Sequence, residues 1–126
     1  MADGSRRWST GIALLTLVAL SCVPRVSGGA DVGGAYAFEQ KYLGRTESEG
    51  LLTLERASDG GWNVYLFHER YGQMEILESD VDPPDVSILA EGPDYAYHIG
   101  AQVSGRLMEG HWRYGTRDGT FVGRRR

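Results

Sequence analysis

The sequence predicts an all-β protein of about eight antiparallel strands that close into a small up-and-down barrel, with a β-sandwich as the alternative. Apolar and polar residues alternate in short segments after Gly33, and these segments follow one another about every 8–12 residues, as in sandwiches and barrels. No stretch there has the 3.6-residue repeat of a helix. The 126 residues include 18 Gly and only four Pro, which suits strands joined by tight turns in a single domain.

The expected strands follow from this alternation, taken in chain order. Residues 62–69 give the clearest case, with one face formed by Trp62, Val64, Leu66 and His68 and the other by Tyr65 and Phe67. Turn residues separate the segments: residues 58–61 (SDGG) tolerate positive φ, residues 115–119 (GTRDG) are rich in glycine, and Pro83 and Pro84 cannot donate to a ladder. The other expected strands span residues 35–42, 51–57, 74–79, 86–91, 95–104, 106–114 and 120–124.

Closure of the sheet is expected because an open sheet leaves two unpaired edges. This chain has few Pro or Lys residues with which to blunt an edge strand, and only a closed barrel removes both edges. An eight-stranded barrel leaves an interior that side chains fill or that holds one small ligand.

The N-terminal segment predicts an exported protein, in the periplasm or outside the cell. Arg6 and Arg7 precede 13 uncharged, mostly apolar residues that end before Pro24. This run is too short to span a bilayer as a helix, which takes about 20 residues. A basic start, a short apolar centre and small residues afterwards are typical of a signal peptide. We therefore expect a hydrophobic signal helix within residues 1–30 and a barrel domain over residues 34–126.

Two ways of processing this leader remain open. Small residues allow cleavage after Gly28 or Ala30, which discards Cys22, and this route is favoured. Alternatively, residues 18–22 (VALSC) resemble a bacterial lipoprotein signal. Residues 1–21 would then be removed, Cys22 would be acylated, and residues 22–33 would tether the barrel to a membrane. Membrane association is expected only through this anchor.

Composition excludes several classes of function. The net charge is −4, and loss of residues 1–30 removes three basic side chains but only one acidic one, so a nucleic-acid partner is not expected. Cys22 is the only cysteine, so the barrel domain has no disulfide, thiol nucleophile or cysteine metal site.

Histidines and carboxylates give no motif for catalysis or metal binding. His68, His98 and His111 fall on three different strands with no close pair of ligands, so we expect solvent-facing or singly bonded histidines. The acidic run of Glu78, Asp80, Asp82 and Asp85 is interpreted as a solvated loop rather than a calcium site. No serine-hydrolase motif occurs. We expect no metal, no cofactor and no enzymatic activity.

The aromatic residues allow two interpretations. Seven Tyr against three Phe is a high ratio for a dry core, and tyrosine hydroxyls can orient an apolar guest inside a barrel. Packing of the rings in the core is the simpler interpretation. The candidate ligand-binding residues are Tyr36, Trp62, Tyr95, Tyr97 and Trp112.

The C-terminal part of the sequence carries a resemblance to a known class of barrels. Residues 103–125 (VSGRLMEGHWRYGTRDGTFVGRR) resemble the closing hairpin of small exported bacterial β-barrels, at Gly105, Leu107, Gly110, Trp112, Gly119, Thr120, Phe121 and Arg124. The layout is similar to calycin-like barrels, such as lipocalins and avidins. The resemblance implies the fold and transfers no functional residue.

Together these features predict an exported, non-catalytic binding module for a small apolar ligand. The alternative is a cell-envelope lipoprotein or enzyme inhibitor that contacts an envelope protein through loops such as residues 80–85 and 92–94.

Overall fold

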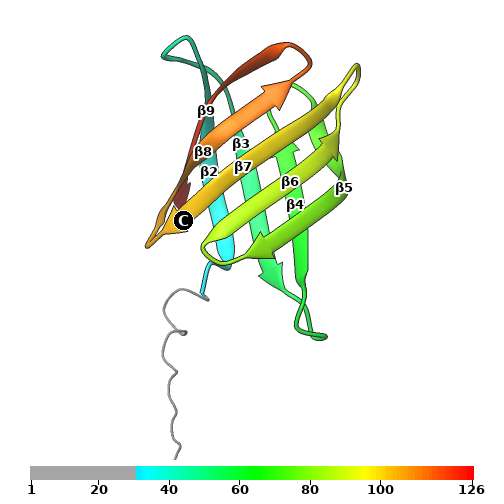
Figure 1. Ribbon diagram of the computed structural model, residues 1–126, viewed down its shortest axis with the longest axis vertical. Helices are drawn as coiled ribbons and strands as arrows, with labels where there is room; N and C mark the ends of the chain where they lie inside the picture. Colours follow the sequence, from blue (N-terminus) through cyan, green and yellow to red (C-terminus); the bar gives the residue numbers. More distant parts are fainter. Residues whose placement is uncertain (1–30) are drawn as a thin grey trace, which may run out of the picture. The chain divides into compact units, whose positions relative to one another are not determined.

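The barrel expected from the sequence is confirmed, with eight strands that each pair antiparallel with the next (Figure 1). The last strand pairs with the first and closes the sheet. The computed structural model describes residues 31–126, of which Val32–Arg126 form one compact unit. The signal peptide, the lipoprotein signal and Cys22 lie outside the described residues. The strands are β2 (Gly34–Tyr42), β3 (Arg45–Arg56), β4 (Trp62–His68), β5 (Gly72–Asp82), β6 (Asp85–Glu91), β7 (Ala96–Ser104), β8 (Leu107–Tyr114) and β9 (Arg117–Arg125).

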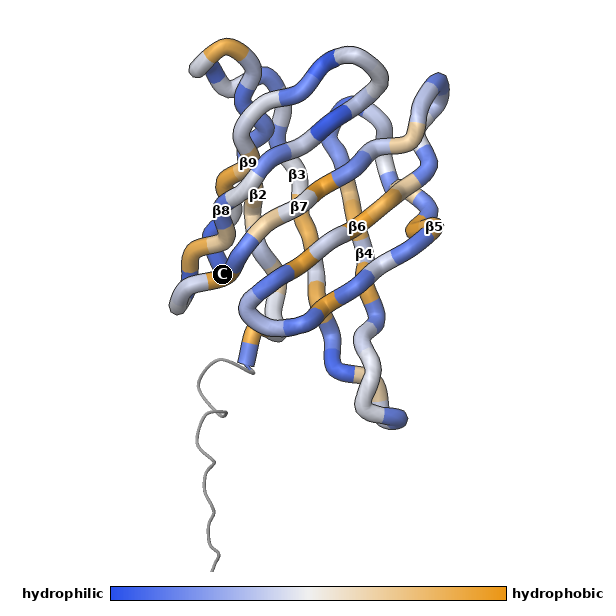
Figure 2. Tube along the Cα trace, in the orientation of Figure 1, coloured by the Kyte–Doolittle hydropathy of each residue, from blue (hydrophilic) through white to orange (hydrophobic). Residues whose placement is uncertain are grey.

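Hydrophobic and hydrophilic residues alternate along β6 and β7 in Figure 2. The buried positions of these strands alternate in the same way, which separates the barrel interior from its outer surface. On β4, Leu66 and His68 point inward and are fully buried, whereas Tyr65 and Phe67 point outward and are about half exposed. The large side chains of the interior are packed against one another, with Phe38 stacked on Phe121 at 4.6 Å between ring centroids. The fully buried large side chains are Tyr36, Phe38, Leu52, Leu54, Leu66, His68, Ile88, Tyr97, Ile99, Met108, Trp112 and Phe121.

Three strands extend beyond the segments that their apolar residues predicted. β3 begins at Arg45 rather than residue 51, β5 continues to Asp82 rather than residue 79, and β9 begins at Arg117 rather than residue 120. Backbone pairing with a neighbouring strand stabilises these ends, although their side chains are mostly polar and face solvent.

The acidic segment is therefore not a loop, and that prediction is wrong. Glu78, Asp80 and Asp82 stand on β5, and Asp85 is the first residue of β6. Their ladder continues up to the pair Asp82–Asp85, so only Pro83 and Pro84 form the turn. The four carboxylates lie along strands on the outer surface.

The shortest ladder in the described barrel joins β4 and β5. These two strands pair only over Leu66–Met74, Phe67–Gln73 and His68–Gly72. Beyond these pairs β4 and β5 diverge, with β5 running obliquely and β4 nearly vertically in Figure 1. We refer to the region between Trp62–Tyr65 and Glu75–Asp82 as the seam. Leu77 bulges out of the β5–β6 ladder along this same stretch.

Among residues 31–126, no helix is long and apolar enough to cross a membrane.

Candidate functional site

A cluster of buried polar groups lies at one end of the barrel, where β2–β3, β4–β5, β6–β7 and β8–β9 are connected. We call this the aromatic end, because Tyr42, Tyr71, Tyr95, Tyr97, Trp112 and Tyr114 surround it. Gln40 is the centre of the cluster and is only 2% exposed. Its position follows from the alternation of β2, which puts Gln40 on the same inner face as Tyr36 and Phe38.

Hydrogen bonds fix the orientation of the Gln40 amide. Its Nε2 donates to Glu47 Oε1 at 2.7 Å, so its Oε1 faces inward as the acceptor. The hydroxyl of Tyr97 donates to this oxygen at 2.6 Å, and His68 Nε2 lies 2.9 Å from it. Because Oε1 can only accept, His68 Nε2 carries the proton.

The environment of His68 favours the neutral imidazole. Its Nδ1 accepts the backbone N–H of Arg70 at 3.1 Å, so both ring nitrogens are bonded in one neutral tautomer. Burial, aided by the charge of Arg70 and opposed by Glu69, lowers the pKa of His68 from 6.5 to about 4. Burial also raises the pKa of the Tyr97 hydroxyl. The prediction of a solvent-facing or singly bonded histidine is thus wrong for His68. The sequence did indicate this burial, because the alternation of residues 62–69 places His68 on the same face as Leu66.

Arg117 covers the side chains of Tyr42 and Trp112 at the aromatic end. It pairs with Glu47, and its guanidinium lies 4.4 Å from the centre of the Tyr42 ring. Beneath it, Trp112 Nε1 donates to the carbonyl of Lys41 at 2.8 Å. Gly119 makes this approach possible, because a Cβ there would overlap the Lys41 carbonyl and lie 2.7 Å from Trp112 Nε1. These contacts connect β2, β8 and β9 at the point where the barrel closes.

The five candidate ligand-binding residues do not line one cavity. The rings of Tyr97 and Trp112 are stacked, with 6.3 Å between their centroids. Tyr95 makes an edge contact with Tyr114, which in turn contacts Tyr97. Tyr36 and Trp62 lie at the opposite end of the barrel. The Tyr36 hydroxyl donates to the carbonyl of Val32 at 2.7 Å, and Arg56 lies over the Trp62 ring at 4.8 Å.

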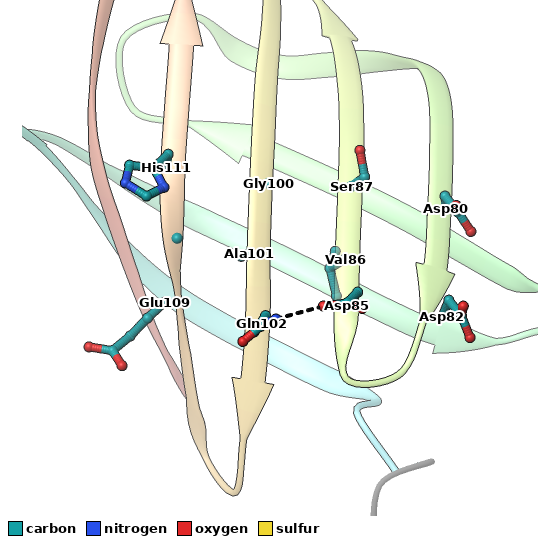
Figure 3. Close-up of a pocket in the computed structure, with 11 residues that line it drawn as sticks. Asp80, Asp82, Asp85, Val86, Ser87, Gly100, Ala101, Gln102, Glu109 and His111 are labelled. Atoms are coloured by element: carbon teal, nitrogen blue, oxygen red, sulfur yellow. Dashed lines mark hydrogen bonds between the residues drawn. The ribbon is translucent and has the colours of Figure 1, made fainter.

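A groove of about 520 Å³ lies on the outer surface of β5–β8 (Figure 3). Gly100 forms its floor, since this residue has no side chain to fill the space between its neighbours. One row of the sheet across the groove consists of Asp80, Ser87, Gly100 and His111. The next row consists of Asp82, Asp85, Gln102 and Glu109, in which Gln102 Nε2 donates to Asp85 Oδ1 at 3.0 Å.

The groove continues into a second hollow of about 410 Å³ around His98, Arg113 and Asp118. Carboxylates therefore outnumber the basic side chains along the whole outer face of β5–β8. The sequence pointed to these carboxylates but placed them in a loop. It gave no sign that Gly100 would open a groove beside them.

The groove places Asp80, Ser87 and His111 in one row. Ser87 and His111 stand on either side of Gly100 on the intervening strand β7, so their backbones are two strand spacings, or about 9.5 Å, apart. In residues 31–126, moreover, no three His, Cys, Asp or Glu side chains are arranged to hold a metal ion.

The fold and its surfaces define a closed, antiparallel, up-and-down β-barrel with a packed interior. Comparison with models of known protein families, with curated proteins and with solved structures gives no match.

Proposed function

We propose that this protein is an exported, non-catalytic binding module that recognises a partner with its outer surface rather than a ligand inside the barrel. The single observation that carries this proposal is the packed interior. Side chains of all eight strands contribute to the core or pack against it, from Tyr36 on β2 to Phe121 on β9. A ligand would have to displace these rings and aliphatic chains, and closely packed protein interiors resist such displacement.

The polar atoms of the candidate ligand-binding residues support the same proposal. A guest in a barrel is oriented by hydroxyl and indole groups that are free to bond it. Here the Tyr97 hydroxyl is bonded to Gln40, the Trp112 indole to Lys41, and the Tyr36 hydroxyl to Val32. These groups already stabilise the fold.

The outer face of β5–β8 is the surface best suited to a partner. It combines a groove of about 520 Å³ with the carboxylates of Asp80, Asp82, Asp85 and Glu109. Such a surface attracts a partner with basic side chains and repels acidic ones. The leader-like residues 1–30 favour an extracytoplasmic location. Membership of the calycin-like barrels remains part of this proposal and rests on the resemblance of residues 103–125.

Site-specific photo-crosslinking in the cells that make the protein tests the proposal. We expect a crosslinker at Gln102, inside the groove, to capture a protein partner, and the charge reversal Asp80→Lys to abolish the capture. A crosslinker at Glu39, on the outer face of β2, is the matched control and should capture nothing of the same mass.

A second measurement distinguishes the interior-ligand alternative. Anilinonaphthalene sulfonate, an anionic dye that fluoresces in apolar surroundings, should show no saturable binding that quenches Trp112. A stoichiometric apolar molecule that co-purifies with the barrel and quenches Trp112 would refute surface recognition and restore the ligand hypothesis.

A further inference from the structure

The seam between β4 and β5 leaves two strand edges without a ladder partner. β4 pairs with β3 along its whole length, but with β5 only from Leu66 onward. β5 pairs with β6 from Glu75 to Asp82, while its other edge faces the seam over the same residues. Every other neighbouring pair of strands among residues 31–126 is joined by a longer ladder.

The hydrogen bonds of the β3–β4 hairpin show which backbone groups of β4 face the seam. Ala57 N–H donates to the Gly61 carbonyl, and Glu69 N–H donates to the Glu49 carbonyl, each at 2.9 Å. Hydrogen-bonded pairs alternate along an antiparallel ladder. The bonded pairs between these two ends therefore include Asn63 and Tyr65, whereas the N–H and C=O groups of Trp62 and Val64 point away from β3 into the seam.

The side chains beside the seam are also incompletely covered. Ser79 pairs with Ile88, and Val81 pairs with Val86. Ile88 and Val86 are 0% and 2% exposed, yet Val81 is only half-buried and Ser79 is exposed. Val64 is likewise half-buried, although its ladder partner Leu54 is fully buried. Inner-face side chains along the seam are thus only partly covered and remain open to solvent.

The outer face of β5 along the seam is acidic. Glu75, Glu78, Asp80 and Asp82 all point outward over the stretch whose edge is free. Two copies of this chain paired through β5 would bring these carboxylates together, and like charges on adjacent strands are destabilising. The charge pattern therefore disfavours a second copy and favours a basic strand.

We propose that the seam accepts an extended segment of a partner polypeptide, which adds a strand along the free edge of β5. Strand addition supplies backbone hydrogen bonds for affinity and alternate side-chain positions for specificity. The segment that fits alternates basic residues, which face outward beside the β5 carboxylates, with apolar residues, which cover Val64 and Val81. This inference rests on the proposed recognition by the outer surface and names the mode of contact at a neighbouring site.

Titration with synthetic peptides tests the proposal. The probe is an eight-residue, acetylated and amidated peptide that alternates Lys and Val. One control replaces each Lys by Glu, and a second replaces two central residues by Pro, which cannot pair. We expect saturable binding of the Lys–Val peptide only, with slower amide hydrogen exchange over Val64 and residues 79–82. Equal binding of the Glu–Val or the proline peptide would overturn the proposal, as would the absence of binding or of protection on β5.

Matched charge reversals separate the seam from the groove. The double variant Glu75→Lys/Glu78→Lys should lower the affinity for the Lys–Val peptide about tenfold, since two attractions become repulsions. Glu109→Lys/Asp118→Lys changes the net charge equally but lies on β8 and β9, and it should change the affinity by less than about threefold.

The two proposals fail in different ways. If Glu109→Lys/Asp118→Lys lowers the affinity for the peptide more than Glu75→Lys/Glu78→Lys does, the peptide binds in the groove. That result would overturn the proposed strand addition at the seam but would leave the proposed recognition by the outer surface intact. An unaltered exchange pattern together with an apolar molecule bound near Trp112 would overturn both.

Discussion

The buried imidazole of His68 makes the stability of the barrel sensitive to mild acid. Protonation would place a hydrogen on Nδ1, against the backbone N–H of Arg70 that now donates to it. The Glu69 carboxylate favours the new charge, but it does not offset the cost of burial and the charge of Arg70. Tyr71 stacks on the ring at 4.4 Å, Tyr97 meets it edge-on, and Gln40 lies between His68 and the carboxylate of Glu47.

The size of the effect follows from the two pKa values. The folded pKa of His68 is about 4, below the unfolded value of 6.5, so the unfolded chain takes up the proton first as the pH falls. The stabilisation is fully present above pH 6.5 and is lost between about pH 6.5 and pH 4. With about 1.36 kcal/mol per pKa unit, the loss is about 2 kcal/mol at pH 5 and about 3 kcal/mol at pH 4.

Urea unfolding at pH 7.5, 6 and 5 measures this loss. The wild type should lose about 2 kcal/mol more of its free energy of unfolding over this range than His68→Gln, which cannot titrate. His98→Gln, on the outer face of β7, is the matched control and should follow the wild type. An NMR titration of the His68 ring in the intact protein provides a direct check. Equal pH dependence of the wild type and His68→Gln, or a folded pKa near 6.5, would refute this account.

Three further substitutions test the packing of the barrel, each by urea unfolding at pH 7.5. The Ser48 hydroxyl is buried without a hydrogen-bond partner in the described chain, so Ser48→Ala should raise the free energy of unfolding by about 1 kcal/mol, and a loss would contradict this assignment. Gly119→Ala should lower it by about 2 kcal/mol, because the new methyl group overlaps the Lys41 carbonyl; an unchanged value would mean that the backbone moves freely there. Trp112→Phe removes the indole N–H from that carbonyl and leaves part of its volume empty, and it should cost about 2 kcal/mol. Combined with Gly119→Ala it should cost less than the sum, and strict additivity would show that the two residues act separately.

Side-chain alternation was sufficient to predict the barrel and most of its strands. β4 illustrates why: every second residue from Trp62 to His68 faces the core, as the sequence indicates. The ends of β3 and β5 could not be predicted in this way, because residues 45–50 and 80–82 are mostly polar. Their pairing is determined by partners that are distant in the sequence or lie across a turn.

The polar cluster at the aromatic end was less accessible. The alternation of β2 and β4 does place Gln40 and His68 on the inner face, but polar residues at those positions do not reveal that they will meet. Gln40 and Tyr97 are 57 residues apart and become neighbours only after the sheet closes. The groove depends in the same way on Gly100, whose missing side chain has an effect only when Ser87 and His111 stand on either side.

The closing ladder between β2 and β9 brings the two ends of the described barrel together. Arg126 N–H donates to the Ala35 carbonyl, and Arg125 Nη1 donates to the Gly33 carbonyl. A short linker could therefore join residue 126 to residue 33, and the chain could be reopened between Gly60 and Gly61 in the β3–β4 hairpin. Such a circular permutant would keep every rung of the sheet, so we expect it to fold into the same barrel although its strands are synthesised in a different order.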